Sequence, residues 1–250
     1  MSMLNFRELS LKTNSRGLKL KRNTIYRSSA PHPAGGDILK KLDDHNIAYI
    51  YDLRSNLEIR KDGQEKVNRA RTVHINVLPA AGMSDGDFEA SLENASVFMN
   101  SLYRDMLSES REYSTLIREI LNQKSPGFLF HCTAGKDRTG IAGVILMHLF
   151  QFSPEDIAQE YLTIDPDLID FLSTKFMPDE SVLKRSVPDL DLSEIRDKML
   201  GFITVKEEYL NSFYSGIKER YGSMDAYIRD FLDIDSREVE ELHRRYLIPS

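Results

Sequence analysis

The chain has a single cysteine, Cys132, in a segment whose residue types suit phosphate chemistry. Gly135 permits a tight backbone turn in the loop that follows, and Arg138 carries a planar fork of donors that can bind two oxygens of one phosphate. The spacing therefore predicts an anion cradle in which loop amides, an arginine and a thiol converge. Such positive surroundings favour the thiolate of Cys132, and a thiolate facing a bound phosphate is a nucleophile.

The alternative interpretation of Cys132 is a small buried core residue beside an ordinary turn. A lone cysteine excludes a disulfide within the chain and a multi-cysteine zinc site. The flanking sequence favours the reactive interpretation, because an apolar strand (residues 127–132) precedes the loop and an apolar helix (138–150) follows it. Free N–H groups and the dipole at the start of a helix both favour a bound anion.

Strands and helices alternate in the rest of the chain, which predicts an α/β fold with a mostly parallel central sheet covered by helices. After residue 153 the pattern is helical to the end, which predicts a helical C-terminal extension. The predicted strands are 47–53, 72–78 and 127–132, and the predicted helices are 37–46, 88–107, 113–123, 138–150, 154–163, 167–176, 193–200, 204–221, 223–232 and 236–247.

Neither an internal repeat nor a Gly/Ser linker marks a domain boundary, so residues 1–250 are predicted to form one domain. Residues 177–192 contain two prolines and several acids, and we interpret them as a mobile connection between helices. Residues 165–200, with an apolar stripe at Leu168, Phe171, Leu172 and Phe176, are a candidate helical insertion or lid. An ordinary packed helix explains the same stripe equally well.

The string from His131 to Gly140, His-Cys-Thr-Ala-Gly-Lys-Asp-Arg-Thr-Gly, resembles the signature loop of the cysteine-dependent phosphatases. Its Gly-Lys-Asp-Arg-Thr-Gly form resembles the atypical bacterial branch of tyrosine and dual-specificity phosphatases, which act on phosphotyrosine and phosphoinositides. Further short matches to that branch are Asn5-Phe6-Arg7, Tyr26-Arg27-Ser28-Ser29, Asp52-Leu53-Arg54-Ser55 with Glu58, Glu160-Tyr161-Leu162, Glu208-Tyr209-Leu210 and Tyr221-Gly222-Ser223.

The resemblance implies a metal-independent phosphomonoester hydrolase with no cofactor. Cys132 would attack phosphorus to give a cysteinyl phosphate, and water would then hydrolyse it. Arg138 and the loop amides would hold the phosphate oxygens, and Thr139 would hydrogen-bond the cysteine sulfur, unless its hydroxyl serves only the helix start. His131 is expected to order the loop rather than transfer protons. The predicted phosphate-binding residues are Cys132, Thr133, Ala134, Gly135, Lys136, Asp137 and Arg138.

The general acid is the least determined part of the site. Many relatives use an aspartate in a Trp-Pro-Asp loop, and this chain has no tryptophan. Asp137 ranks first because Arg138 fixes it beside the phosphate, and Asp85 and Asp87 follow because they lie in a Gly-containing loop after Leu78-Pro79. The alternatives are a helix-start charge for Asp137 and turn residues for the other two.

Two cations remain to be assigned. Lys136 could meet a second phosphate or an inositol headgroup, and a solvated loop lysine is the alternative. Arg54, at the end of a predicted strand, could brace the signature loop through Asp52 or Glu58, or touch substrate. Bracing is the preferred interpretation of Arg54.

The composition is that of a soluble protein, with 41 % hydrophobic and 29 % charged residues and a mean hydropathy of −0.40. The first residues are too polar for a signal peptide and no stretch suits a membrane span, which predicts a cytoplasmic protein, with export by another route left open. Residues 1–27 hold seven basic residues and one acid, interpreted as a solvated surface segment rather than a nucleic-acid patch.

The expected partners are a phosphorylated protein or phosphoinositide substrate and a phosphate ion in the loop. The competing functions are an inositol polyphosphate or phytate phosphatase and a non-catalytic phosphate-binding relative.

Overall fold

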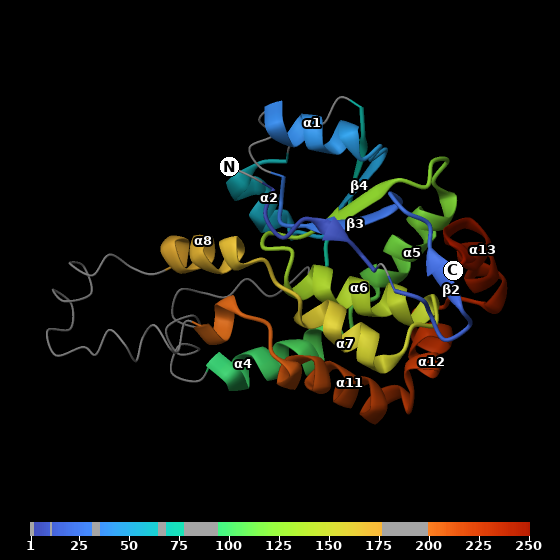
Figure 1. Cartoon of the computed structure of the whole chain (residues 1–250). Coiled ribbons are helices and arrows are strands. Elements are labelled where there is room, and N and C mark those ends of the chain that lie inside the picture. The colour runs from blue at the N-terminus through green and yellow to red at the C-terminus, as the bar shows by residue number, and fades with distance from the viewer. Residues whose placement is uncertain (1–2, 11, 32–35, 65–68, 78–94, 177–199) are drawn as a thin grey trace, which may run out of the picture.

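The central sheet carries the signature loop on its middle strand (Figure 1). In this computed structural model, which describes residues 3–10, 12–31, 36–64, 69–77, 95–176 and 200–250, the strand order is β1-β3-β6-β4-β5. The strands β3, β6, β4 and β5 are parallel, and only the edge strand β1 is antiparallel to its neighbour. Their bounds are β1 Arg7–Glu8, β3 Ile25–Ser28, β4 Tyr49–Asp52, β5 Arg71–His74 and β6 Phe128–His131.

The parallel register brings the ends of three strands together. Ser28 of β3 and Asp52 of β4 both pair with His131 of β6, directly before the signature loop. The carboxyl ends of parallel strands are where open α/β sheets bind ligands. The sheet therefore supplies the site with β3 on one side of the loop and β4 on the other.

Helices cover both faces of the sheet, because alternate strand residues point to opposite faces. Ile50 and Leu129 pack with the α1 side chains Ile38 and Leu42 on one face. The larger core lies on the other face, against α5 and α6. The helices are α1 Gly36–Asp44, α2 Asn56–Asp62, α4 Ala95–Ser101, α5 Glu112–Asn122, α6 Asp137–Leu149, α7 Pro154–Leu162, α8 Pro166–Phe176, α11 Glu207–Tyr221, α12 Met224–Ala226 and α13 Ser236–Tyr246, with π-helices η1 Leu102–Leu107 and η2 Tyr227–Phe231.

A second, two-stranded sheet joins distant parts of the chain. Strand β2 (Leu18–Leu20) pairs antiparallel with β7 (Leu247–Pro249), and Figure 1 shows the C-terminus beside β2. The helices within the described ranges are too short or too polar to cross a membrane.

The predicted fold class is confirmed: the sheet is mostly parallel and helices flank it. The three predicted strands correspond to β4, β5 and β6, and most predicted helices lie within two or three residues of their observed bounds. Residues 88–94, 177–192 and 193–199 lie outside the described residues, so the predictions made for them stay predictions. The sequence analysis missed α2 and the strands β1, β2, β3 and β7.

The basic segment is the main correction to the predicted organisation. Residues 1–27 were predicted to be a solvated surface segment, and Lys12, Arg16 and Arg22 are exposed. The segment nevertheless contributes three strands, and Arg27 of β3 is 1 % exposed. Glu160 of α7 pairs with the Arg27 guanidinium, Nη1 to Oε2 2.7 Å, and this pairing allows the charge to be buried.

Candidate active site

The signature loop, residues 132–138, turns from the end of β6 into the start of α6. Gly135 has a φ of +66°, and a Cβ atom there would lie 2.2 Å from the carbonyl oxygen of Ser28. Only glycine fits this close approach to β3. Helix α6 begins at Asp137, and the Lys136 carbonyl accepts its first internal hydrogen bond from Gly140 N. The N–H groups of the first helical turn therefore remain free to bind an anion.

A pocket of about 250 Å³ opens over this loop. Cys132 lies in its wall and is 2 % exposed, so the thiol is buried yet faces the pocket. Three apolar side chains from α8 and from residues 200–203 form the opposite side. The lining residues are Glu58, Cys132, Thr133, Ala134, Lys136, Asp137, Arg138, Leu172, Phe202 and Ile203.

Arg138 is held in place by Glu58, a residue for which the sequence analysis found a different role. The two guanidinium nitrogens Nη1 and Nη2 donate to the two carboxylate oxygens at 2.6 and 2.7 Å. The Thr133 hydroxyl donates to the same carboxylate. Burial alone would raise the pKa of Glu58, but the hydrogen bonds and charge of Arg138 outweigh it and lower the pKa to about 2. The pair is thus ionised at neutral pH.

Helix α2 positions Glu58. Ser55 is the N-cap: its hydroxyl accepts from Glu58 N at 3.2 Å, and Glu58 Oε2 accepts in return from Ser55 N at 2.7 Å. This capping box fixes the first turn of α2. The Ser-x-x-Glu spacing is the signal in the sequence that would have predicted the helix and its contact residue.

Arg54 pairs with Asp52 and not with Glu58. Its Nε and Nη2 atoms donate to the two Asp52 oxygens at 2.9 and 2.8 Å, and Arg54 is 3 % exposed. Asp52 Oδ1 also lies 3.9 Å from His131 Nδ1. Burial by itself would raise the pKa of Asp52, but His131 and Arg54 hold it well below its usual value. Bracing of the loop through Asp52 is therefore the interpretation that this geometry supports.

His131 lies behind the loop and is 2 % exposed. Its Nδ1 donates to the carbonyl oxygen of Cys132 at 3.2 Å, as expected for a residue that orders the loop. Burial lowers the pKa of His131, although the nearby Asp52 carboxylate by itself would raise it.

Asp137, the first-ranked acid, lines the pocket and contacts Tyr103 of η1. The Tyr103 hydroxyl donates to Asp137 Oδ1 at 2.7 Å, and Lys136 Nζ lies 3.4 Å from the same oxygen. Burial and the charge of Asp137 raise the pKa of Tyr103 well above its usual value, so the hydroxyl stays protonated. Tyr103 was missed because nothing in its local sequence indicates a polar contact. Asp85 and Asp87 lie outside the described residues.

Lys136 is not a solvated loop lysine. It is 3 % exposed, and its Nζ donates to the carbonyl oxygens of Phe202 and, at 3.2 Å, Thr204. These carbonyls lie at the C-terminal end of the helical residues 200–203, where a positive charge is favoured. In this structure the ammonium joins the signature loop to the apolar side of the pocket.

Thr139 was expected to hydrogen-bond either the cysteine sulfur or the backbone. It is fully buried, and its hydroxyl oxygen has no hydrogen-bond partner among the described residues. Neither expected contact is formed, so the hydroxyl is available to the sulfur without first breaking another bond.

Clusters of three or more His, Cys, Asp or Glu side chains able to hold a metal do not occur in the described part of the chain. The cationic side chains among the described lining residues are Lys136 and Arg138, and together with the amides at the start of α6 they suit an anion. The arrangement can bind a phosphate and present a thiol to its phosphorus atom.

Comparison with known proteins assigns a family to this arrangement. Residues 1–248 match the tyrosine phosphatase family, and the chain belongs to it. A protein of Cupriavidus necator, provisionally named a tyrosine-protein phosphatase, is 28 % identical over 97 % of this chain and 85 % of its own length. The triple specificity protein phosphatase PtpB of Mycobacterium tuberculosis is 25 % identical over 79 % of this chain and 80 % of its own. The predicted resemblance is thereby confirmed, and the chain is a phosphatase.

Two solved structures are also similar. The core catalytic domain of the PP-IP phosphatase Siw14 from S. cerevisiae aligns at 14 % identity over 81 % of this chain and 93 % of its own, with a TM-score of 0.33. TpbA of P. aeruginosa aligns at 16 % identity over 75 % of this chain and 94 % of its own, with a TM-score of 0.32. The family assignment rests on the sequence matches and not on these low TM-scores.

Proposed function

We propose that residues 1–250 form one catalytic domain that hydrolyses phosphomonoesters through a cysteinyl phosphate, with phosphotyrosine as the preferred substrate class and phosphoinositides as a second. The observation that carries the proposal is the buried thiol of Cys132 in a pocket that also presents Arg138 and the amides at the start of α6. These groups would hold the phosphate oxygens as the thiolate attacks.

In the first step the Cys132 thiolate attacks phosphorus, the phosphorus–oxygen ester bond breaks, and Asp137 donates a proton to the leaving oxygen. In the second step a water molecule attacks phosphorus and gives a proton to Asp137. The sulfur–phosphorus bond then breaks, which releases phosphate and the thiolate, and Thr139 donates a hydrogen bond to that sulfur.

The preference for an aryl ester follows from the opposite side of the pocket. Leu172, Phe202 and Ile203 present apolar surface where the alcohol group of the ester would lie. An inositol polyphosphate needs several cations, and Lys136, one of two cationic side chains among the described lining residues, already binds two carbonyls. The pocket thus suits one phosphate on an apolar group better than several phosphates on a polar ring.

The test of the reaction is hydrolysis of p-nitrophenyl phosphate in EDTA by the wild-type protein and by Cys132→Ser. We expect activity that the substitution abolishes and, after acid quench, a phosphoryl adduct on Cys132 detected by mass spectrometry. Wild-type activity no higher than that of Cys132→Ser would leave only the non-catalytic phosphate-binding interpretation. Activity lost in EDTA and restored by a divalent cation would contradict the metal-independent mechanism.

The substrate class is tested with a phosphotyrosine peptide, a phosphoinositide and phytate. We expect the highest kcat/KM for the peptide. Lys136→Ala should change the relative rates, because it releases the segment of Phe202 and Thr204 that forms the apolar side of the pocket. Lys206→Ala, which removes a more exposed lysine near the same segment, is the matched control. Relative rates that do not change in Lys136→Ala would show that this residue has no role in selection.

A further inference from the structure

Two buried side chains donate to one carbonyl group on the back of the signature loop. Asn5 Nδ2 and Arg27 Nη2 each lie 2.9 Å from the carbonyl oxygen of Gly135. Asn5 is 3 % exposed and Arg27 1 % exposed. Neither residue lines the pocket, and both come from the first 27 residues, far in sequence from the loop.

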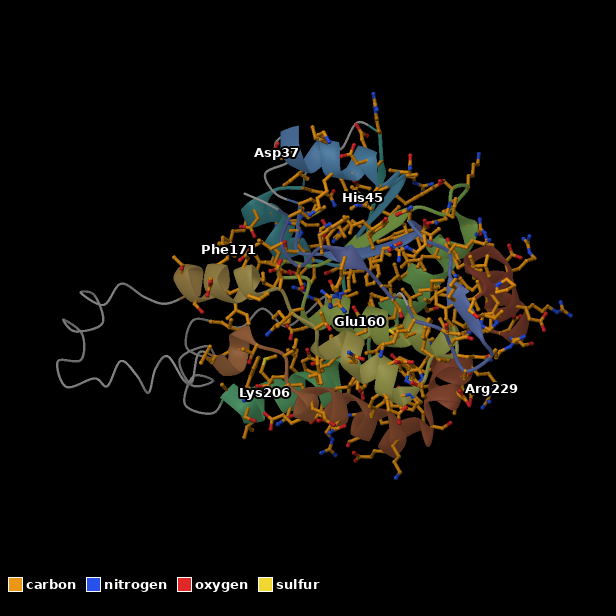
Figure 2. The ribbon with its side chains drawn as sticks, in the orientation of Figure 1. Asp37, His45, Glu160, Phe171, Lys206 and Arg229 are labelled. Atoms are coloured by element: carbon orange, nitrogen blue, oxygen red, sulfur yellow. The ribbon has the colours of Figure 1, made fainter. Side chains whose placement is uncertain are left out.

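Arg27 is committed to this position by its other contact. Its Nη1 donates to Glu160 Oε2 at 2.7 Å, and Glu160, shown at the centre of Figure 2, also accepts from Arg7 Nε at 3.0 Å. The guanidinium packs against α6 where Cβ atoms built on Gly140 and Gly143 would lie only 3.7 and 3.4 Å from its nitrogens. These are ordinary van der Waals distances, so α6 packs closely on the buried cation.

Asn5 is held by four contacts besides the one to Gly135, one of which is the hydrogen bond from Arg7 Nη1 to its carbonyl oxygen at 3.4 Å. Its backbone N–H donates to Asp165 Oδ2 at 3.0 Å, and its Oδ1 accepts from Asp165 N at 3.2 Å and from Arg7 Nη1 at 2.6 Å. Its φ of 55° is a backbone conformation that asparagine tolerates better than most residues. The side-chain amide is thereby fixed with its NH₂ group on the loop.

The direction of the Gly135 carbonyl determines the direction of the next N–H group. In a planar trans peptide the C=O of one residue and the N–H of the next point in opposite directions. A Gly135 oxygen drawn back toward Asn5 and Arg27 therefore turns the N–H of Lys136 forward, toward the pocket. The Thr133 oxygen is drawn back in the same way by the backbone N–H of Ala30 at 3.1 Å, which turns Ala134 N–H forward.

We propose that Arg27 and Asn5 are positioning residues that align the Lys136 amide with the phosphate by anchoring the Gly135 carbonyl. Gly135 has a positive φ and no side chain of its own to fix its peptide group, and its carbonyl is held by two side chains rather than by the backbone of a neighbouring strand. This inference rests on the proposed function, because the alignment of the Lys136 amide affects catalysis only if a phosphate binds in the loop.

The test separates this role from general stabilisation of the fold. Asn5→Asp keeps the Oδ1 acceptor and the shape of the side chain but removes the donor to Gly135. Arg27→Lys keeps the positive charge for Glu160, but an ammonium on a shorter side chain cannot reproduce the two-sided contact. Tyr51→Phe is the control, because it removes a hydrogen bond that is equally buried, Tyr51 to Gln123 at 2.7 Å, away from the loop.

For each positioning variant we expect kcat for p-nitrophenyl phosphate to fall by about tenfold or more, since an oxyanion donor that is lost altogether costs about a hundredfold or more. The inhibition constant of vanadate should rise to a similar extent. The double variant should lose less than the product of the single losses, because both donors act on one carbonyl. Tyr51→Phe should be less stable in urea but keep the wild-type kcat and vanadate constant.

Folded Asn5→Asp and Arg27→Lys proteins with wild-type kcat and vanadate affinity would overturn the anchor. So would equal losses of kcat in Tyr51→Phe, because the effect would then follow stability alone. A wild-type protein that neither hydrolyses the ester nor binds vanadate would instead overturn the proposed function. Vanadate binding without turnover would overturn the proposed hydrolysis, and a vanadate constant unchanged in both positioning variants would then overturn the anchor as well.

Discussion

At the scale of single residues, Arg138, the arginine proposed to bind phosphate, is oriented before any substrate arrives. Glu58 holds both terminal nitrogens of Arg138 and also the hydroxyl of Thr133, so one carboxylate orders two residues of the signature loop. Nη1 also donates to the carbonyl oxygen of Leu53 at 3.4 Å, so among the described residues the Nε hydrogen and the second Nη2 hydrogen are left for phosphate. This preorganisation gives Glu58 two measurable roles, one in stability and one in catalysis.

The stability role depends on pH. The folded protein lowers the pKa of Glu58 to about 2 from its ordinary 4.5, so the Glu58 contribution is complete above pH 4.5 and is lost as the pH falls toward 2. We expect the difference in unfolding free energy between wild type and Glu58→Gln, measured in urea, to shrink over that range. In an Arg138→Met background the pH dependence of this difference should largely disappear. If the difference in unfolding free energy between wild type and Glu58→Gln stays constant from pH 7 to pH 2.5, folding does not lower the pKa of Glu58.

A second residue-scale prediction concerns the proton donor. Asp137→Asn should slow esters with poor leaving groups much more than p-nitrophenyl phosphate, because a poor leaving group needs the proton as its bond breaks. Tyr103→Phe removes the 2.7 Å hydrogen bond to Asp137 and should show the same selectivity with a smaller loss, about tenfold. Steady-state rates over a series of aryl phosphates measure both effects. A uniform loss in Asp137→Asn would exclude Asp137 as the acid and favour Asp85 or Asp87.

At the scale of elements, the site depends on a short helix that the sequence analysis did not predict. Helix α2 has seven residues and no buried side chain, so neither length nor apolar periodicity indicates it. Its capping box nevertheless places Glu58 against Arg138. The helix is stabilised by polar contacts to the loop rather than by burial in the core.

Ser55→Ala tests this coupling between an element and the site. Loss of the cap should lower the unfolding free energy by about 1 kcal/mol. It should also lower kcat/KM by a few-fold, because the first turn that carries Glu58 becomes less fixed, whereas Glu58→Gln should lower kcat/KM by about tenfold. Urea unfolding and p-nitrophenyl phosphate kinetics measure the two effects. If kcat/KM stays at the wild-type value while stability falls, α2 does not transmit its order to Arg138.

The sequence predicted those parts of the site that are close together along the chain. Cys132, Gly135 and Arg138 lie in seven residues between an apolar strand and an apolar helix, and the structure brings them to one pocket. It did not predict β3, because Arg27 and Ser28 are polar and local patterning treats polar residues as solvated. Their burial depends on Glu160, more than 130 residues away, and such long-range pairing leaves no periodic signal.

At the scale of the whole molecule, two segments remote in sequence from the signature loop contact it on different sides. Asn5, which precedes β1, and Arg27 of β3 reach the back of the loop, whereas residues 200–204 reach its front through Lys136. On the same side Leu168 and Leu172 of α8 pack with Ile203, in the region of Figure 2 where Phe171 is labelled. The loop is thus enclosed by parts of the chain that are remote from it in sequence.

The last prediction concerns whether α8 and residues 200–204 can leave the pocket. Lys136 Nζ gives two hydrogen bonds to carbonyls of this segment, and each is worth about 1 kcal/mol net. Without them the open population should rise by about thirtyfold, since about 1.4 kcal/mol is a factor of ten. Proteolysis of a transiently open segment follows that population. We therefore expect a protease to cleave Lys136→Ala faster than wild type within residues 165–204. Vanadate should change the cleavage rate of the wild-type protein. Lys206→Ala should be cleaved at the wild-type rate. If neither Lys136→Ala nor vanadate changes the cleavage rate, the apolar contacts of Leu168, Leu172 and Ile203 alone hold the segment closed, and α8 is an ordinary packed helix rather than a lid.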